Sequence, residues 1–186
     1  MDLGPTPVMG AAFAVMLAVA MPAVADPFAD AVFERISERL ALMKPVAAWK
    51  RINGVAVEDR AREAVVLEEA SAAAEEAGLG AEAARPLFAA QIEAAKEIQR
   101  CWIARWDAGA RLPPTPPSNL STEIRPRLLE IGAALLAAIE AALASGVVFD
   151  QTLAADFAAA VDLDCLPPAA RAGVYRDLAG VRLRPG

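Results

Sequence analysis

Apolar residues follow a helical period from Phe28 onward. In the first stretch they recur three or four residues apart, at Val32, Ile36, Leu40, Met43, Val46 and Ala47. Pro45 predicts a kink or a restart in this helix, because proline disrupts a helix interior, and Asn53-Gly54 predicts its end. A second helix is expected from Glu58-Asp59 to about Gly78, since carboxylates suit a helix N-terminus.

The pattern continues with a third helix over about 81–108. Residues 112–119 then carry four prolines in eight positions, which excludes helix and favours extended polyproline geometry. Ser121 or Thr122 is expected to cap a long helix that reaches about Gly146, and shorter helices are predicted over 150–161 and 168–179. No stretch alternates as a strand would, so the sequence predicts an all-α protein of about six helices.

The proline segment has two interpretations, a linker between domains or a crossover within one bundle. We favour the crossover, because neither half shows polar outer faces all round. The expected organisation is one all-α domain over 26–186, with residues 26–110 forming the half that holds the functional site and 119–186 a supporting half.

The N-terminal 25 residues have the pattern of a secretory signal. An apolar run from Val8 to Val19 is too short to span a membrane, and Ala23-Val24-Ala25 supplies small residues for cleavage after Ala25. No Lys or Arg precedes the run, so either the usual basic region is absent or the true start lies elsewhere, and an uncleaved anchor or a buried helix is the alternative to a cleaved signal. The expected location is periplasmic or secreted, with no membrane association after cleavage. Export would permit a Cys101–Cys165 disulfide, although two free buried thiols fit the spacing equally well.

Composition narrows the chemistry. Alanine occupies 46 of the 186 positions and aromatic residues only 5%, which favours helix over sheet. The net charge of −6 and the isoelectric point near 4.8 argue against a nucleic-acid partner. The chain has no histidine, which excludes a Ser-His-Asp triad, a Cys-His dyad and any His-ligated zinc, and two cysteines cannot form a four-cysteine metal site.

Polar residues on the apolar helix faces are the candidates for function. Arg39 and Lys50 are 11 residues apart, about three helical turns, and therefore share a face. Gln99 falls on the core-facing side of the third predicted helix, and Asp59, Arg62 and Glu63 lie in the first turns of the second. A single cation on an apolar face usually has a structural role. Several cations and an amide directed into one helical core instead indicate a pocket for a small anion that carries a hydroxyl. Such a pocket holds no nucleophile, so any catalysis in it would depend on orientation and electrostatic stabilisation.

These residues resemble the AroQ-type chorismate mutases, specifically the secreted, periplasmic subclass. The resemblance covers about residues 33–106 in ordered spacing and, more loosely, Ile124-Arg125-Pro126. It rests on Glu38-Arg39-Leu40, Pro45-Val46-Ala47-Ala48-Trp49-Lys50, Val57-Glu58-Asp59, Arg62-Glu63, Phe88-x-x-Gln91-Ile92, Ile98-Gln99 and Trp106.

The resemblance implies a helical enzyme that converts chorismate to prephenate by a pericyclic rearrangement, without cofactor or metal. It further implies a complete active site in each chain and a homodimer. By position, Arg39 and Arg125 would bind the substrate carboxylates, while Lys50 and Gln99, the catalytic pair, would donate to the ether oxygen. Glu63 would accept from the ring hydroxyl with help from the Asp59 backbone, and Arg62 would order that end of the pocket.

Some features leave alternatives open. Ala95 stands where relatives commonly carry Ser or Thr to hold a carboxylate, and Arg127 competes with Arg125 as the third cation, although we favour Arg125. The competing functions are an isochorismate pyruvate-lyase on the same kind of fold and a secreted helical binding module without turnover. The Lys50/Gln99 pair argues against the binding module, because carboxylate binding alone would not need both.

Overall fold

The computed structural model describes Met1 and residues 26–111 and 118–185. The predicted signal segment and most of the proline segment lie outside the described residues. Within the described part the fold is all-α, which confirms the predicted class. Its elements are α1 (Pro27–Ala41), α2 (Met43–Ile52), α3 (Arg60–Glu76), α4 (Ala81–Asp107), the π-helical turn η1 (Leu120–Ile124), α5 (Arg125–Ala144), α6 (Ala154–Ala160) and α7 (Pro168–Leu178).

The first predicted helix is two helices, which raises the count in the described residues to seven plus the π-helical turn. Helix α1 ends at Ala41, four residues before Pro45. Proline has no N–H to donate to the carbonyl four residues back, and its ring clashes with that carbonyl. The chain therefore breaks at Leu42, and Pro45 sits in the first turn of α2, where it is tolerated.

The long helix of the second half also begins differently from the prediction. Asn119 is the capping residue, and its side chain accepts the N–H groups of Ser121 at 2.9 Å and Thr122 at 3.0 Å. The first turn is π-helical, with the N–H of Arg125 donating to the carbonyl of Leu120. The expected caps Ser121 and Thr122 are thus donors to the cap, and Arg125 begins α5.

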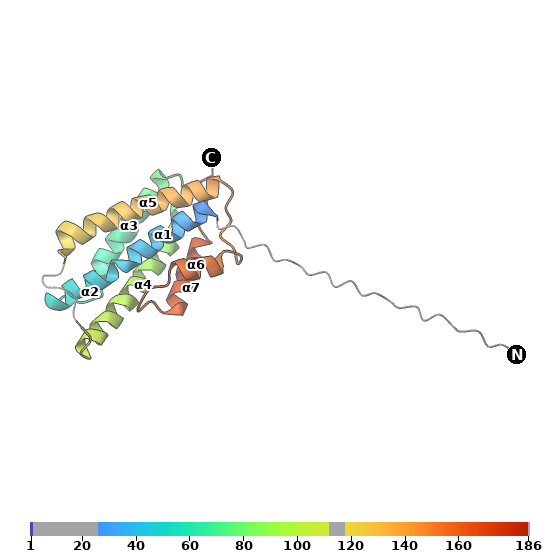
Figure 1. The fold of residues 1–186 in the computed structure, drawn as a ribbon. Helices are drawn as coiled ribbons and strands as arrows, with labels where there is room; N and C mark the ends of the chain where they lie inside the picture. Colours follow the sequence, from blue (N-terminus) through green and yellow to red (C-terminus); the bar gives the residue numbers. More distant parts are fainter. Residues whose placement is uncertain (2–25, 112–117, 186) are drawn as a thin grey trace.

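Helices from both sides of the proline segment pack together. Helix α5 lies along α1, α4 contacts α2, α3 and α7, and α6 packs on α1 (Figure 1). The fully buried ring of Phe33 on α1 meets Phe157 of α6 edge-on, with 5.2 Å between ring centroids, and Tyr175 of α7 at 6.3 Å. The core at this end is therefore built from residues more than 120 positions apart.

Helix α4 is tied to the C-terminal segment near both of its ends. Before its first turn, Gly80 donates its N–H to Arg182 at 3.0 Å, and Leu79 forms an isolated antiparallel bridge with Leu183. Gly78 precedes this bridge with φ +80°, a conformation that glycine adopts without the strain other residues would incur. In its later part, Cys101 is disulfide-bonded to Cys165, with Cα atoms 5.7 Å apart, so the bonded alternative is the one found.

Among the described residues, no helix has both the length and the apolar composition needed to cross a membrane.

Candidate active site

A pocket opens between α1, α2, α3, α4 and α5, and all seven predicted site residues line it. Its walls carry five cations, Arg39, Lys50, Arg62, Lys96 and Arg125, and three carboxylates, Asp59, Glu63 and Glu69. The pocket lining is therefore net positive by two charges, although the whole chain is net −6. Because apolar side chains such as Met43 and Phe88 complete the walls, charges inside it interact more strongly than in bulk water.

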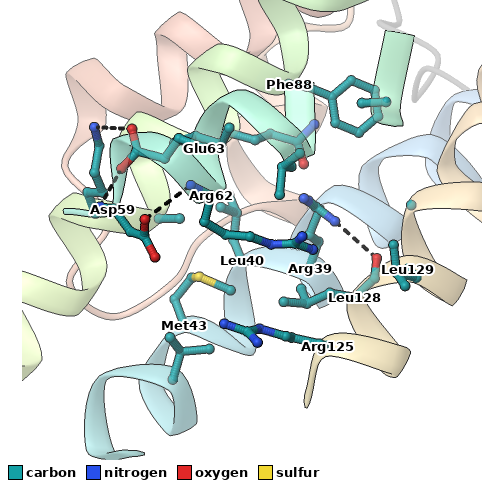
Figure 2. Close-up of a pocket in the computed structure, with 18 of the residues that line it drawn as sticks. Arg39, Leu40, Met43, Asp59, Arg62, Glu63, Phe88, Arg125, Leu128 and Leu129 are labelled. Carbon is teal, nitrogen blue, oxygen red and sulfur yellow. Dashed lines mark hydrogen bonds and ion pairs between the residues drawn. The ribbon is translucent and has the colours of Figure 1, made fainter. Parts of the chain in front are cut away.

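Arg39 lies in the last turn of α1, and α2 begins just after the break at Leu42, so both helices contribute residues to the pocket. Its Nη1 donates to the Leu128 carbonyl of α5 at 3.0 Å, and its guanidinium lies 5.7 Å from the centroid of the Phe88 ring (Figure 2). A side-chain carbon at Gly132 of α5 would lie 3.6 Å from Arg39 Nη1, an ordinary van der Waals distance, so the approach of α5 does not require a glycine there. Burial lowers the pKa of Arg39 to about 10, so the side chain remains cationic at neutral pH.

Lys50 and Gln99 face the pocket from α2 and α4. The Lys50 ammonium donates to the Val57 carbonyl at 2.7 Å, which fixes its position and leaves further donors. Burial lowers the pKa of Lys50, and Arg125 lowers it further, while Asp59 and Glu63 partly offset these effects. Gln99 is buried, and among the described residues the hydrogen-bond acceptor of its Nε2 is the Met43 sulfur, at 3.6 Å. Thioether sulfur is a weak acceptor, so this amide can turn to a better one at little cost.

The first turn of α3 positions the acidic end of the pocket. The Asp59 side chain accepts the Arg62 N–H at 3.1 Å and caps the helix, while the Asp59 N–H donates to Glu63 Oε1 at 3.1 Å (Figure 2). The other oxygen of Glu63, Oε2, is 3.1 Å from the ammonium of Lys96 on α4. Arg62 is half-buried and forms an ion pair with Glu69 at 3.6 Å. The Glu63 carboxylate is thus held by a backbone amide and a lysine.

The two candidate arginines of the second half differ in placement. Arg125 is half-buried, lines the pocket and donates to the Ser121 hydroxyl at 3.5 Å. Arg127 is exposed, pairs with Glu130 at 3.4 Å on the surface of α5 and is absent from the pocket lining. Figure 2 shows Arg39, Arg62 and Arg125 extending from three different helices toward one space. The geometry therefore favours Arg125 as the third cation.

Two buried polar residues of the pocket were not among the predicted site residues. Lys96 is only 7% exposed, and burial lowers its pKa, but hydrogen bonds to Glu93 and Glu63 outweigh that effect and raise it above the usual value. Gln91 is 1% exposed, and neither atom of its amide has a hydrogen-bond partner in the described residues. Gln91 could have been found from the sequence, because it lies at helical spacing of four from Ala95 and eight from Gln99, on the same core-facing side. Lys96 follows Ala95 in sequence and resembles a solvated lysine.

The arrangement suits recognition of a small dianion that also carries a hydroxyl. Three arginines and two lysines supply charge and directed N–H groups, and Glu63 supplies an acceptor. Among the described residues, no group of three or more Cys, Asp or Glu side chains is placed to hold a metal ion. The site defines a helical anion-binding protein whose chemistry would depend on fixed donors.

Comparison with known proteins identifies the family. The family profile described as chorismate mutase type II matches residues 29–100. The secreted chorismate mutase of Yersinia pestis is 48% identical over 71 residues, which cover 38% of each chain. The monofunctional chorismate mutase of Enterobacter agglomerans is 32% identical over 111 residues, 60% of each chain. The matched segments thus span less than two thirds of either relative.

Structural similarity extends further along the chain. The crystal structure of the secreted chorismate mutase from Yersinia pestis superposes with a TM-score of 0.75 and 31% identity, covering 82% of this chain and 97% of that one. The chain belongs to the type II, or AroQ, chorismate mutase family. The resemblance drawn from the sequence motifs is confirmed.

Proposed function

We propose that this chain converts chorismate to prephenate without a cofactor. The observation that carries the proposal is that Lys50 and Gln99, two donors from different helices, line one pocket whose lining is net positive. Chorismate has two carboxylates, a ring hydroxyl and an ether oxygen. The cations, the Glu63 carboxylate and the Lys50/Gln99 pair match these three kinds of group.

Each residue has a role that its placement supports. Arg39 and Arg125 bind the two carboxylates, and Lys50 contacts the ether oxygen and a carboxylate. The ring hydroxyl donates to Glu63 and accepts the Asp59 N–H, which now donates to Glu63 across 3.1 Å. Arg62, whose own N–H is capped by Asp59, orders this end of the pocket.

The reaction breaks the ether C–O bond and forms a C–C bond within one molecule. Binding both carboxylates selects the compact chair-like conformer, which lowers the entropic part of the barrier. As the C–O bond breaks, negative charge develops on the ether oxygen, where Lys50 Nζ and Gln99 Nε2 donate. Such donors stabilise the transition state most effectively when they are fixed before the reaction.

The deciding experiment follows chorismate loss and prephenate formation with the purified protein. A parallel assay with isochorismate, measuring pyruvate release, tests the lyase alternative. Turnover of chorismate alone supports the mutase, and turnover of isochorismate alone overturns it in favour of the lyase. Tight chorismate binding without turnover would indicate the non-catalytic module.

We also propose export, with cleavage after Ala25, and a homodimer of one-domain chains over 26–186. A named relative is a secreted enzyme, and the Cys101–Cys165 bond suits an oxidising compartment. Expression of the full chain in a Gram-negative host followed by mass measurement of the periplasmic form tests the first proposal. A measured mass that differs from that of a chain beginning at Asp26 would contradict it.

Light scattering on the periplasmic form tests the proposed homodimer, and the mass of a monomer would contradict it.

A further inference from the structure

Gln91 is a buried polar residue of the pocket that the catalytic scheme does not use. It lies on α4, is 1% exposed and lines the pocket, yet neither its amide nitrogen nor its amide oxygen has a hydrogen-bond partner among the described residues. Buried side-chain amides are nearly always hydrogen-bonded, because removing an unpaired amide from water is unfavourable. A partner for Gln91 is therefore expected from a molecule that occupies the pocket.

The surroundings of Gln91 indicate what kind of group that partner is. Phe88 precedes it by one helical turn on α4, and the Arg39 guanidinium lies 5.7 Å from the Phe88 ring centroid. Arg39 makes a single hydrogen bond, to Leu128, within the described residues, so most of its five N–H groups remain for a ligand. Gln91 and Arg39 thus border the same end of the pocket, where the positive charge favours an anionic oxygen.

That end is distinct from the place where the ether oxygen would lie. Gln99 is eight residues beyond Gln91 on the same helix, about 12 Å along the axis at 1.5 Å per residue. Between them stands Ala95, one turn from each, and its methyl group offers no hydrogen bond. On this line of α4 residues an amide therefore lies one turn to each side of Ala95, and the ammonium of the neighbouring Lys96 is already paired with Glu63.

We propose that Gln91 is a substrate-binding residue whose amide N–H donates to the chorismate carboxylate held by Arg39. It supplies, from one turn away, the neutral donor that Ala95 lacks. This inference rests on the proposed function, since it names the carboxylate of that substrate. Arg39 provides the charge, and the amide provides a directed bond that fixes the orientation of the carboxylate.

The competing role for Gln91 is structural, with a buried water as its partner. The two roles have opposite consequences for Gln91→Met, which keeps the length of the side chain and removes the amide. A ligand-binding amide is unsatisfied in the free protein, so its removal leaves Tm unchanged or raises it. A structural amide contributes to folding, so its removal lowers Tm and leaves substrate binding unchanged.

The experiment measures kcat, KM and Tm of the full chain and of Gln91→Met with chorismate. We expect KM to rise about 10- to 100-fold, the range for a lost hydrogen bond to a charged group, and kcat to stay within about threefold. Gln151→Met is the matched control, since it makes the same change at an exposed position outside the pocket, and it should leave all three values unchanged. An unchanged KM in Gln91→Met overturns the inference.

A rescue variant decides the case in which KM rises and Tm falls together. The double variant Gln91→Met with Ala95→Ser restores a neutral donor one turn away. If Gln91→Met raises KM a hundredfold, we expect the double variant to bring KM back down by at least tenfold. A serine would not repair a purely structural defect, so no recovery overturns the inference. If the unmodified chain shows no turnover, the proposed function fails instead. Calorimetric titration with chorismate then compares the chain with Gln91→Met, and equal affinities overturn the role of Gln91 separately.

Discussion

Lys96 and Glu63 form the most enclosed ion pair among the described residues. Their side chains are 9% and 22% exposed, and 3.1 Å separates Lys96 Nζ from Glu63 Oε2. Since Glu63 Oε1 accepts the Asp59 N–H, both carboxylate oxygens are held before any substrate binds. The pair joins α3 to α4 and sets the orientation of the group that would accept the ring hydroxyl.

Replacing Lys96 with Met should therefore affect both folding and catalysis. Glu63 would lose a partner while partly buried, and we expect the free energy of unfolding to fall by about 1–3 kcal/mol. We expect kcat/KM to fall about tenfold, because the carboxylate is no longer oriented. Arg100→Met is the matched control on the same helix, since it breaks a half-exposed pair with Glu97 that should contribute under about 0.5 kcal/mol. Wild-type kinetics in Lys96→Met would argue against the positioning role.

Lys50→Ala and Gln99→Ala should each lower kcat/KM more than a hundredfold. Each removes one donor to the developing oxyanion, a loss of about 3–4 kcal/mol of transition-state stabilisation. Lys44→Ala is the control for Lys50, because Lys44 lies on the same helix over the Trp102 ring, at 3.8 Å, and outside the pocket. Circular dichroism verifies that the variants remain folded. Near-normal turnover in either pocket variant would contradict the mechanism.

Activity should persist at mildly alkaline pH. Gln99 does not titrate, and Lys50 must stay protonated, so kcat should be flat from about pH 5 to 8 and decline only toward the lowered pKa of Lys50. Gln99→Glu should reverse this profile, because a carboxyl group donates only when protonated, and activity would then be confined to acid pH. A steep loss of kcat in the unmodified chain between about pH 5 and 7 would refute the amide's role.

Arg125→Ala and Arg127→Ala should differ in their kinetics. Arg125 lines the pocket, so removing its charge should raise KM by about tenfold or more, the loss of a charged hydrogen bond. Arg127 is exposed, and its pair with Glu130 is on the surface, so its removal should change KM by less than about twofold. Equal effects of the two substitutions would show that the assignment of the third cation is mistaken.

Loss of the disulfide should affect stability more than turnover. Cys101 and Cys165 close a loop with a sequence separation of 64, for which chain entropy gives about 4 kcal/mol. In a chain of this length, the variant Cys101→Ser with Cys165→Ser should melt roughly 10 °C lower. Its kcat at 25 °C should stay within about twofold, because neither cysteine lines the pocket. Calorimetry and the chorismate assay measure the two effects.

Local patterns predicted the fold closely where one helix buries one face. The apolar positions located the start of α1 and both ends of α4 to within two residues, and the capping carboxylate did the same for α3. The sequence did not reveal the start of η1, because Asn119, Ser121 and Thr122 are all capping residue types, and only the π-helical turn selects Asn119.

Local sequence patterns likewise predicted some residues of the pocket and not others. Arg39, Lys50 and Gln99 were found because each is a polar residue on an apolar helix face. The burial of Lys96 depends on α3 packing across it, which no spacing within α4 can show. Whether the Gln91 amide finds a partner likewise depends on five helices at once.

The attachment of α4 near both ends has a consequence for how this sequence can vary. The helix that carries Gln91, Lys96 and Gln99 is braced by Arg182 at its start and by Cys165 in its later part. The braces act through backbone groups and one covalent bond, and the side chains of α6 and α7 contribute chiefly apolar volume, which tolerates exchange of one hydrophobic residue for another. The C-terminal third can thus drift in sequence while the catalytic face stays aligned.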